Sequence, residues 1–236
     1  RLSLPAFHDL RTFVEKFHPD LIHIVSPFLL GMSAYKLAAE SGIPVVNSYH
    51  TSYVSYLKYY GFGWMENRGW QYMRWFYNRG AMSLVPSNAT ITELEGKGFK
   101  NLTLWERGID VSRFSPRFKD YSLRKYWSPD GRPIALFVGR LVREKDLDVL
   151  IKAYWILKER NIAFKLVFVG DGPMRDEIAK TLPDCVLAGF LTGTDLSRAY
   201  ASADIFVFPS TTETFGNVII EAGASAIPSV GAAARR

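Results

Sequence analysis

Short apolar, β-branched runs alternate with helix-length amphipathic segments along almost the whole chain, and no other feature restricts the possible folds as much. Strand–helix alternation at this spacing predicts βαβ units and parallel sheets. The predicted strands cover residues 21–25, 44–49, 83–85, 102–104, 134–138, 165–169, 185–187 and 205–208, and the predicted helices cover residues 4–17, 30–40, 64–79, 88–97, 146–160, 174–182, 195–202 and 217–226.

The alternation is interrupted once, between about Gly108 and Arg132, by a segment with several basic residues and two prolines. We therefore predict an α/β chain of two doubly wound, Rossmann-like domains, over residues 1–113 and 114–236. Ligands of such sheets bind beyond the carboxyl ends of the strands. Two such edges that face each other form a cleft, and the residues that directly follow strands would line it.

Composition excludes several classes of protein. With 48% hydrophobic residues in 236, the chain can bury a sizeable core and is not intrinsically disordered. The single cysteine, Cys185, excludes a disulfide scaffold and a thiolate zinc finger, and no apolar run approaches the roughly 20 residues of a membrane-spanning helix. The net charge of +6 is split evenly between the predicted domains, so we predict no nucleic-acid partner.

Two cations follow the fifth predicted strand. Gly139 and Arg140 come directly after it, Lys145 lies five residues beyond Arg140, and a predicted helix begins beside them. A diphosphate fits such a set, because a planar guanidinium, an ammonium group and the backbone N–H groups of a helix N-terminus all bind phosphate oxygens. A solvated loop with charges placed by chance is the alternative.

A G-x-G sequence follows the sixth predicted strand. Gly170, Asp171 and Gly172 precede Pro173, which suits the first turn of a helix. Arg175 replaces the third glycine of a dinucleotide fingerprint, so we disfavour a dinucleotide-dependent oxidoreductase. The two glycines indicate either a close backbone approach to a ligand or a plain tight turn.

The most informative stretch follows the last predicted strand. Glu213 lies in a loop rich in Ser and Thr, Phe215 and Gly216 follow, and Asn217 opens a helix that carries Glu221 one turn later. The helix N-terminus can bind a phosphate, and Glu221 can accept two hydrogen bonds from ribose hydroxyls. The two carboxylates, eight positions apart, can thus contact two parts of one ligand. A helix-capping acid and a surface acid are the alternative.

Polar residues also follow strands in the first half of the chain. Tyr49, His50 and Thr51 come after the second predicted strand, Ser87 after the third and Arg107 after the fourth. We assign these five residues to the acceptor side of the predicted cleft. A structural role for the histidine and a helix N-cap role for Ser87 are the alternatives.

Taken together, these motifs resemble the family 4 retaining glycosyltransferases, whose GT-B fold has two Rossmann-like domains with the site in the cleft between them. The resemblance covers nearly the whole chain and rests on the order and spacing of G-R-L-x-x-E-K at 139–145, G-D-G-P at 170–173 and E-x7-E at 213–221. The first-half motifs are most similar to the branch of sulfoquinovosyldiacylglycerol synthases and lipid-directed mannosyltransferases, at residues 48–51, 84–87 and 107–110.

The resemblance implies a donor site for a nucleotide-diphosphate sugar and transfer of a hexose to a hydroxyl acceptor, with retention of anomeric configuration. Arg140 and Lys145 would neutralise the departing diphosphate. Glu213 would lie by the donor sugar and Glu221 would hold the ribose.

The resemblance also implies contacts to the nucleobase and the sugar. Gly189 and Phe190 would flank the nucleobase, and His50 would face the transferred sugar from the first domain. No metal or other cofactor is implied.

The chain departs from the family at its ends. The first strand and glycine-rich loop expected before Arg1 are absent, as are the closing helices, so we predict an incomplete N-terminal domain and a chain truncated at both ends. Ala226 stands where the family has a glycine. A nucleotide-sugar-binding module without turnover therefore stays open as an alternative to an active enzyme.

An aromatic-rich segment runs from Tyr49 to Arg79. It holds 12 of the 34 aromatic residues, with four basic residues against one acidic residue. Aromatic rings beside cations suit the interface of an anionic membrane. We therefore predict a lipid acceptor and a cytoplasmic protein that is peripheral at the inner face of a membrane. Packing of these rings in a core is the alternative.

Overall fold

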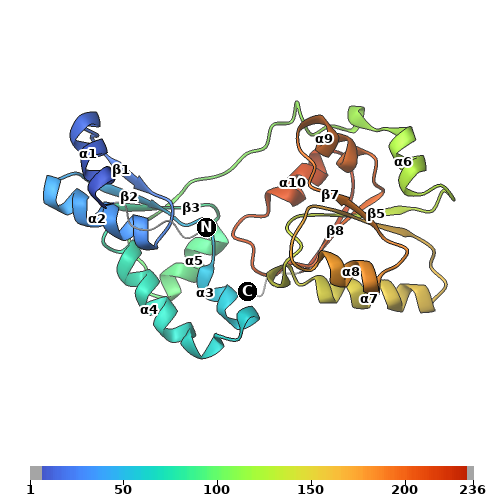
Figure 1. Cartoon of the computed structure of the whole chain (residues 1–236), viewed down its shortest axis with the longest axis horizontal. Coiled ribbons are helices and arrows are strands. Elements are labelled where there is room, and N and C mark those ends of the chain that lie inside the picture. The colour runs from blue at the N-terminus through green and yellow to red at the C-terminus, as the bar shows by residue number, and fades with distance from the viewer. Residues whose placement is uncertain (1–6, 233–236) are drawn as a thin grey trace. The chain divides into compact units, whose positions relative to one another are not determined.

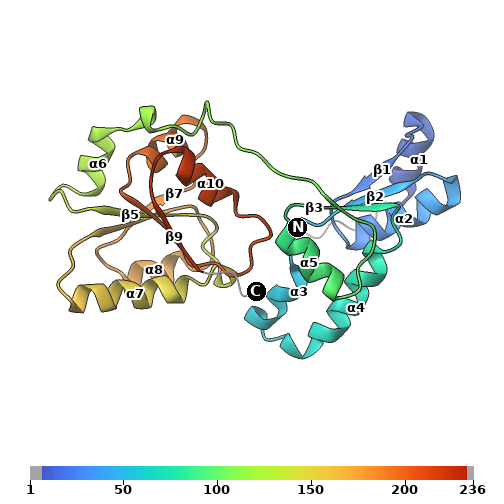
Figure 2. The same ribbon diagram turned by 180° about the vertical axis from the view of Figure 1, so that it is seen from behind.

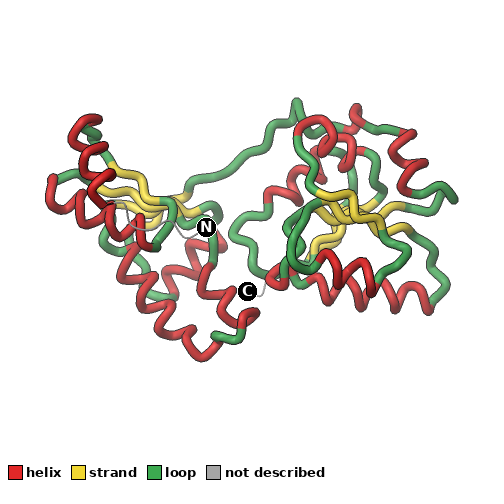
Figure 3. The backbone as a smooth tube through the Cα atoms, viewed as in Figure 1, coloured by secondary structure: helices red, strands yellow, loops and turns green. Residues whose placement is uncertain are grey.

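The computed structural model describes residues 7–232, and the chain divides into two compact units, Arg1–Arg107 and Gly108–Arg236. Each unit contains a parallel β-sheet flanked by helices (Figure 3). The boundary predicted after Arg113 lies inside the second unit. The start of the first predicted helix, at residues 4–6, and most of the Ala/Arg end, at residues 233–236, lie outside the described residues.

The described part of the first unit contains a four-stranded sheet. Its strands are β1 (Ile22–Ile24), β2 (Val45–Ser48), β3 (Met82–Val85) and β4 (Leu102–Leu104), and its helices are α1 (Phe7–Phe17), α2 (Leu29–Ser41), α3 (Tyr53–Tyr56), α4 (Glu66–Tyr77) and α5 (Asn88–Gly96). All neighbouring strands are parallel and their order, β1-β2-β3-β4, follows the chain. The helices α4 and α5 lie on one side of this sheet (Figures 1 and 2).

Aromatic rings fill much of the core of the first unit. Tyr49, Phe76 and Tyr77 are each at most 2% exposed, and the ring of Tyr77 meets those of Tyr49 and Phe76 at centroid distances of 5.4 and 5.5 Å. The buried amide of Asn47 donates a hydrogen bond to Tyr35 Oη at 2.7 Å. The core therefore includes rings from the aromatic-rich segment as well as aliphatic side chains.

The described part of the second unit contains a five-stranded sheet. Its strands are β5 (Ile134–Val138), β6 (Lys165–Val169), β7 (Val186–Gly189), β8 (Ile205–Phe208) and β9 (Ser229–Gly231), and its helices are α6 (Tyr121–Trp127), α7 (Leu147–Glu159), α8 (Arg175–Thr181), α9 (Gly193–Ala201) and α10 (Asn217–Ala224). Short 3₁₀ turns lie at Leu57–Tyr60 and Gly63–Met65 in the first unit, and at Pro116–Phe118 and Arg143–Lys145 in the second. Every residue of β5 and β6 is buried, so both faces of these strands are covered, as expected of central parallel strands.

The strand order of this second sheet is β7-β6-β5-β8-β9, so the direction of winding reverses between β5 and β8. Right-handed crossovers in opposite directions place their helices on opposite faces of a sheet. Accordingly, α7 and α8 cover one face while α9 and α10 cover the other (Figures 1 and 2). This is the doubly wound arrangement, and it makes the carboxyl ends of β5 and β8 the expected place for a ligand.

The structure contains two elements of the second unit that the apolar pattern did not predict. The helix α6 lies in the segment interpreted as a boundary: Asp120 caps it by accepting hydrogen bonds from two backbone N–H groups, and Trp127 is buried. The strand β9 is exposed and short, and it forms by parallel pairing with β8. Neither element has an apolar run that would reveal it in the sequence. The cap at Asp120 stabilises α6, and pairing with β8 stabilises β9.

Within residues 7–232, no helix is both long and apolar enough to cross a membrane.

Candidate functional site

The loops that leave the carboxyl ends of β5 and β6 are joined by backbone hydrogen bonds to the last residues of the neighbouring strands, β6 and β7. Gly139 N donates to Val169 O at 2.9 Å, and Gly170 N donates to Gly189 O at 2.7 Å. The parallel ladders thus continue by one step into the loops. As a result, the sequence motifs after β5 and β6 and the residues after β7 lie at one edge of the sheet.

The glycines of the G-x-G sequence are required by the neighbouring loop. A Cβ on Gly170 would lie 1.9 Å from Gly139 O, and a Cβ on Gly172 would lie 2.4 Å from Leu141 O. Asp171 uses its carboxylate within the turn, where Oδ1 accepts a hydrogen bond from Gly172 N at 2.8 Å. Close approach of backbone to backbone therefore explains both glycines, and it holds the loop after β6 against the loop after β5.

Cations and carboxylates alternate in the loop after β5. The Arg140 side chain is 64% exposed, and its Nη2 lies 3.4 Å from an oxygen of Glu144, whose side chain is buried. Lys145 is much less exposed and forms an ion pair with Glu213 from the loop after β8. The structure thus brings together Lys145 and Glu213, two predicted site residues that are 68 positions apart.

The Glu213 loop is attached to the turn Arg143–Lys145 and its cap by side-chain hydrogen bonds. Ser210 Oγ donates to Glu213 Oε1 at 3.0 Å, and Thr211 donates from both its N and its Oγ1 to Asp146 Oδ2 at 2.9 and 2.8 Å. These bonds hold the Glu213 carboxylate at the rim of the sheet. They also occupy the carboxylate of Asp146, which with Asp148 has the spacing of a D-x-D pair.

The N-terminus of α10 lies at the same edge. Gly216 caps it with a left-handed backbone (φ 83°), and the half-buried Phe215 precedes that cap. The side-chain oxygen Oδ1 of Asn217 is buried and has no hydrogen-bond partner within the described residues. Such an orphaned acceptor is costly unless a ligand or water reaches it, so it marks a place where a polar ligand atom fits.

Glu221 has a partner that the sequence did not predict. Tyr200 Oη, from α9, donates a hydrogen bond to Glu221 Oε2 at 2.8 Å. Tyr200 could have been noticed as a phenol on the apolar face of a helix, since a buried hydroxyl needs an acceptor. Of the residues expected at the nucleobase, Gly189 ends β7 and Phe190 follows it, and the Phe190 ring is 78% exposed.

The carboxyl edge of the first sheet gathers His50, Arg107 and two residues that sequence reasoning missed, His23 and Trp105. An Arg107 N–H donates to His50 Nδ1, and the Trp105 ring lies 6.2 Å from His50 and 6.0 Å from His23 between ring centroids. His23 Nε2 in turn lies 2.5 Å from Ser48 Oγ. His23 alternates with apolar neighbours on β1, which is the signal that could have revealed it.

The protonation state of His50 follows from these contacts. Burial, the Arg107 charge and the nearby His23 all lower the pKa of His50 below its ordinary value of 6.5. Because a guanidinium can only donate, Nδ1 is an acceptor and the proton of the neutral ring sits on Nε2. At neutral pH, Nε2–H is therefore the group that His50 can offer to a ligand hydroxyl.

Three other predicted acceptor-side residues have different environments. The prediction for Tyr49 needs correction, because its ring packs in the core against Tyr77 and Phe99 and is 2% exposed. Ser87 caps α5 by accepting a hydrogen bond from Thr90 N at 3.2 Å, which is the alternative role stated above. Thr51 lies at intermediate exposure next to His50.

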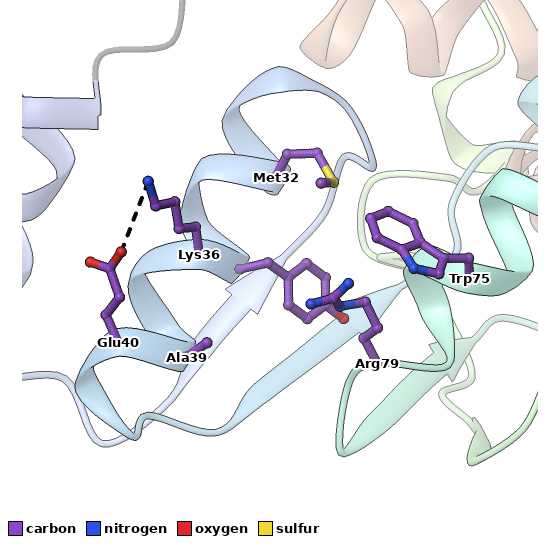
Figure 4. Close-up of a pocket in the computed structure, with 7 residues that line it drawn as sticks. Met32, Lys36, Ala39, Glu40, Trp75 and Arg79 are labelled. Atoms are coloured by element: carbon purple, nitrogen blue, oxygen red, sulfur yellow. Dashed lines mark ion pairs between the residues drawn. The ribbon is translucent and has the colours of Figure 1, made fainter.

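The aromatic-rich segment divides into buried and exposed rings. Its buried rings belong to the core. Of the exposed ones, Tyr60, Phe62 and Trp64 lie at the 3₁₀ turns before α4, and Trp75 lies near the end of α4. The end of α4 also borders a pocket of about 380 Å³, in which the Arg79 guanidinium lies over the Trp75 ring at 4.7 Å (Figure 4). The pocket is lined by Met32, Tyr35, Lys36, Ala39, Glu40, Trp75 and Arg79.

Metal-ligating side chains do not cluster in the part of the chain that the structure describes: no group of three or more His, Cys, Asp or Glu residues is placed to hold an ion there.

Comparison with known proteins gives two family models that match the chain. Glycosyltransferase Family 4 matches residues 1–113, and Glycosyl transferases group 1 matches residues 132–235. The GDP-mannose-dependent alpha-mannosyltransferase of Mycobacterium tuberculosis is 38% identical over 227 residues, which are 96% of this chain and 58% of that protein. The sulfoquinovosyl transferase of Arabidopsis thaliana is 36% identical over 241 residues, with 99% of this chain and 46% of that protein covered.

Among solved structures, the sucrose-phosphate synthase of Thermosynechococcus elongatus has a similar fold. Its TM-score is 0.80 at 21% identity, and the match covers 97% of this chain and 59% of that one. The chain thus spans about half the length of the proteins it matches.

Proposed function

Because the chain belongs to the glycosyltransferases of group 1 and family 4, we propose that it transfers a hexose from a nucleotide-diphosphate sugar to a hydroxyl acceptor with retention of anomeric configuration. The family and the GT-B fold predicted from the sequence are confirmed by the matches. The activity is proposed for the whole protein, since the chain spans about half of its relatives.

One observation carries this proposal: Lys145 and Glu213 form an ion pair at the carboxyl edge of the second sheet, beside the exposed guanidinium of Arg140. A departing diphosphate develops negative charge, and fixed cations that face this charge lower the barrier. In the proposed mechanism Arg140 binds the diphosphate as a planar fork and Lys145 as a point charge. Glu213, which Ser210 and Lys145 hold in place, lies by the donor sugar.

The N-terminus of α10 supports the remainder of the donor. Its first backbone N–H groups have no partner within the helix and favour an anion. The buried, unpartnered Asn217 Oδ1 can accept a hydrogen bond from the donor. In the proposed pose Glu221 accepts from the ribose hydroxyls, and the backbone of Gly189 and Phe190 flanks the nucleobase.

Donor binding and turnover are measured as separate events. The chain is mixed with GDP-mannose, UDP-glucose or ADP-glucose, and binding is followed by thermal shift. Turnover is followed as donor hydrolysis, in which water accepts the sugar and the nucleoside diphosphate is released. GDP-mannose comes first because the Mycobacterium tuberculosis relative is named for it. Binding with turnover is expected. Binding without release would favour a nucleotide-sugar-binding module.

Site variants test the assignment of residues. We expect Lys145→Ala and Glu213→Ala each to lower turnover by about 100-fold or more, as does loss of a group that stabilises a transition-state charge. Lys152→Ala, which removes an exposed lysine of α7, is the matched control and should keep the wild-type rate. Wild-type rates in both site variants would overturn the assignment.

The proposed chemistry assigns the neutralisation of the diphosphate to protein cations, without a metal. Turnover should therefore survive chelation by EDTA, and restoration of lost turnover by added Mg²⁺ would contradict the metal-free mechanism.

On the acceptor side we propose that Nε2–H of His50 contacts a sugar or acceptor hydroxyl. Thr51 and Arg107 are proposed to support it.

A lipid acceptor is proposed from the surface around the 3₁₀ turns before α4. Tyr60, Phe62 and Trp64 are each at least 49% exposed there, and Lys58 and Arg68 add positive charge. Exposed rings insert at headgroup depth while cations attract anionic lipid. We therefore propose peripheral association with an anionic membrane.

Sedimentation with vesicles tests this association. The chain should sediment with vesicles of phosphatidylcholine and phosphatidylglycerol, and less with phosphatidylcholine alone. Trp64→Ala should weaken the binding. Tyr126→Ala, which removes a 79% exposed ring from α6 in the other unit, is the control. Sedimentation with neither vesicle, or equal loss in both variants, would refute the proposed surface.

A further inference from the structure

Tyr200 lies near the end of α9 and is completely buried. Its ring meets Phe114 and Phe206 at centroid distances of 5.6 and 5.7 Å, so the core of the second unit fixes its position. Only its hydroxyl reaches the site described above, where it donates to Glu221 Oε2 at 2.8 Å. A rigid core residue is thus connected to a side chain of the candidate donor site.

This hydroxyl remains a donor over the whole useful pH range. Burial, followed by the charge of Glu221 and their hydrogen bond, raises the pKa of Tyr200 above its ordinary value. The phenol therefore keeps its proton, and an ionised carboxylate can only accept. The direction of the hydrogen bond is fixed by chemistry.

The hydrogen bond restricts a flexible side chain. Glu221 is half-buried on α10, and a glutamate otherwise loses rotamer entropy when a ligand fixes it. With Oε2 held by Tyr200, the other oxygen, Oε1, has no hydrogen-bond partner among the described residues. A carboxylate offers about four lone-pair sites, so several remain for other donors.

We propose that Tyr200 is a positioning residue, which holds the Glu221 carboxylate in the orientation that accepts the ribose hydroxyls of a bound nucleoside diphosphate. This inference rests on the proposed function, because it assumes that Glu221 contacts the ribose. Tyr200 acts through Glu221 and does not itself touch the ligand. Its contribution is therefore specific to the ribose and independent of the diphosphate.

Calorimetry with paired nucleotides isolates this contribution. GDP is compared with 2′-deoxy-GDP, and UDP with 2′-deoxy-UDP, on the 236-residue chain. The wild type should bind the ribonucleotide about tenfold more tightly, as expected for one hydrogen bond to a charged group. Tyr200→Phe should reduce this ratio to about threefold or less and leave the affinity for the deoxynucleotide within about twofold.

Two further variants separate positioning from a loss of stability. Tyr154→Phe removes a hydroxyl from another buried ring of the same core and should leave the ratio unchanged. In Glu221→Gln, adding Tyr200→Phe should change the ratio little, since residues that act together are not additive. Because a ratio is measured on the folded fraction of one protein, partial unfolding of a variant cancels.

The outcomes are distinguishable. A Tyr200→Phe variant that binds both nucleotides more weakly, with the wild-type ratio, has lost only stability and overturns the positioning role. A wild type that binds nucleotides without preferring the ribonucleotide also overturns it, because Glu221 then does not accept from the 2′-hydroxyl. A wild type that binds none of the four nucleotides overturns the proposed function, and this inference with it.

Discussion

The substitution Ala226→Gly should stabilise the second unit, because Ala226 occupies a left-handed backbone position that closes α10. Its φ is 59°, Ala226 N donates to Gly223 O, and Ile227 N donates to Ala222 O at 3.2 Å. This pair of bonds is the Schellman motif, in which the left-handed residue is usually glycine. The same pair of bonds closes α5 with Gly98 at the left-handed position.

The magnitude follows from two opposing terms. A non-glycine residue in the left-handed region costs about 1–2 kcal/mol, and a glycine recovers this but adds about 0.5–1 kcal/mol of chain entropy to the unfolded state. Ala226 is exposed, so its methyl group contributes little packing. We expect a net stabilisation of about 0.5–1 kcal/mol, which raises the unfolding midpoint by roughly 2–4 °C for a domain of this size.

Scanning calorimetry at neutral pH measures the shift, with two glycine–alanine exchanges as controls. Gly42→Ala, in the first unit, places a methyl group into open space at φ 68° and should lower the unfolding midpoint of that unit by a similar amount. Ala224→Gly, inside the last turn of α10, should also lower the midpoint, because the loss of helix propensity reduces the free energy of unfolding by about 0.5–1 kcal/mol. An unchanged or lower midpoint for Ala226→Gly, with both controls behaving as expected, would refute the reasoning.

Three further predictions concern a close approach and two titrating groups. Gly170→Ala should destabilise the second unit by about 3 kcal/mol or more in urea denaturation, since its Cβ would meet Gly139 O at 1.9 Å; a tolerated alanine would show that the loops can separate. Hydrogen bonds from Arg132 lower the pKa of Asp184 from 3.8 to about 2, so its contribution is present above pH 4 and disappears as the pH falls toward 2; after discounting for solvent, Asp184→Asn should cost about 1 kcal/mol at pH 7 and progressively less below pH 4. By NMR, the pKa of His50 should lie below 6.5 and should rise in Arg107→Met. Because the folded-state pKa is lowered, protonation of His50 should reduce the free energy of unfolding as the pH falls below 6.5. An unchanged pKa of His50 in Arg107→Met would mean that the Arg107 charge has no effect.

Much of the candidate site in the second unit could be predicted because its residues directly follow strands. Arg140 and Lys145 follow β5, and Glu213 follows β8, so parallel pairing brings them to one edge whatever the details of packing. Local rules were also sufficient at Gly42, which ends α2 with a left-handed backbone, and at Ser87, which caps α5. Such signals depend on the residue and its near neighbours along the chain.

Other features depend on contacts between distant parts of the chain. Tyr49 follows a strand as His50 does, yet its ring turns into the core. Tyr200 gives no sign in the sequence of its hydrogen bond to Glu221, because that bond depends on how α9 packs against α10. Successive side chains of extended backbone point to opposite faces, so position after a strand alone cannot tell a core ring from a site ring.

By itself, the sequence determined that this chain forms parallel α/β sheets, that its motif residues follow strands and that it belongs with the group 1 and family 4 glycosyltransferases, since apolar periodicity and motif spacing are properties of the chain. The tertiary structure alone decided which partners hold each site residue: Lys145 on Glu213, Tyr200 on Glu221 and Arg107 on His50. The physical reason is the short range of a hydrogen bond, which forms only after packing has fixed both partners within about 3 Å of each other.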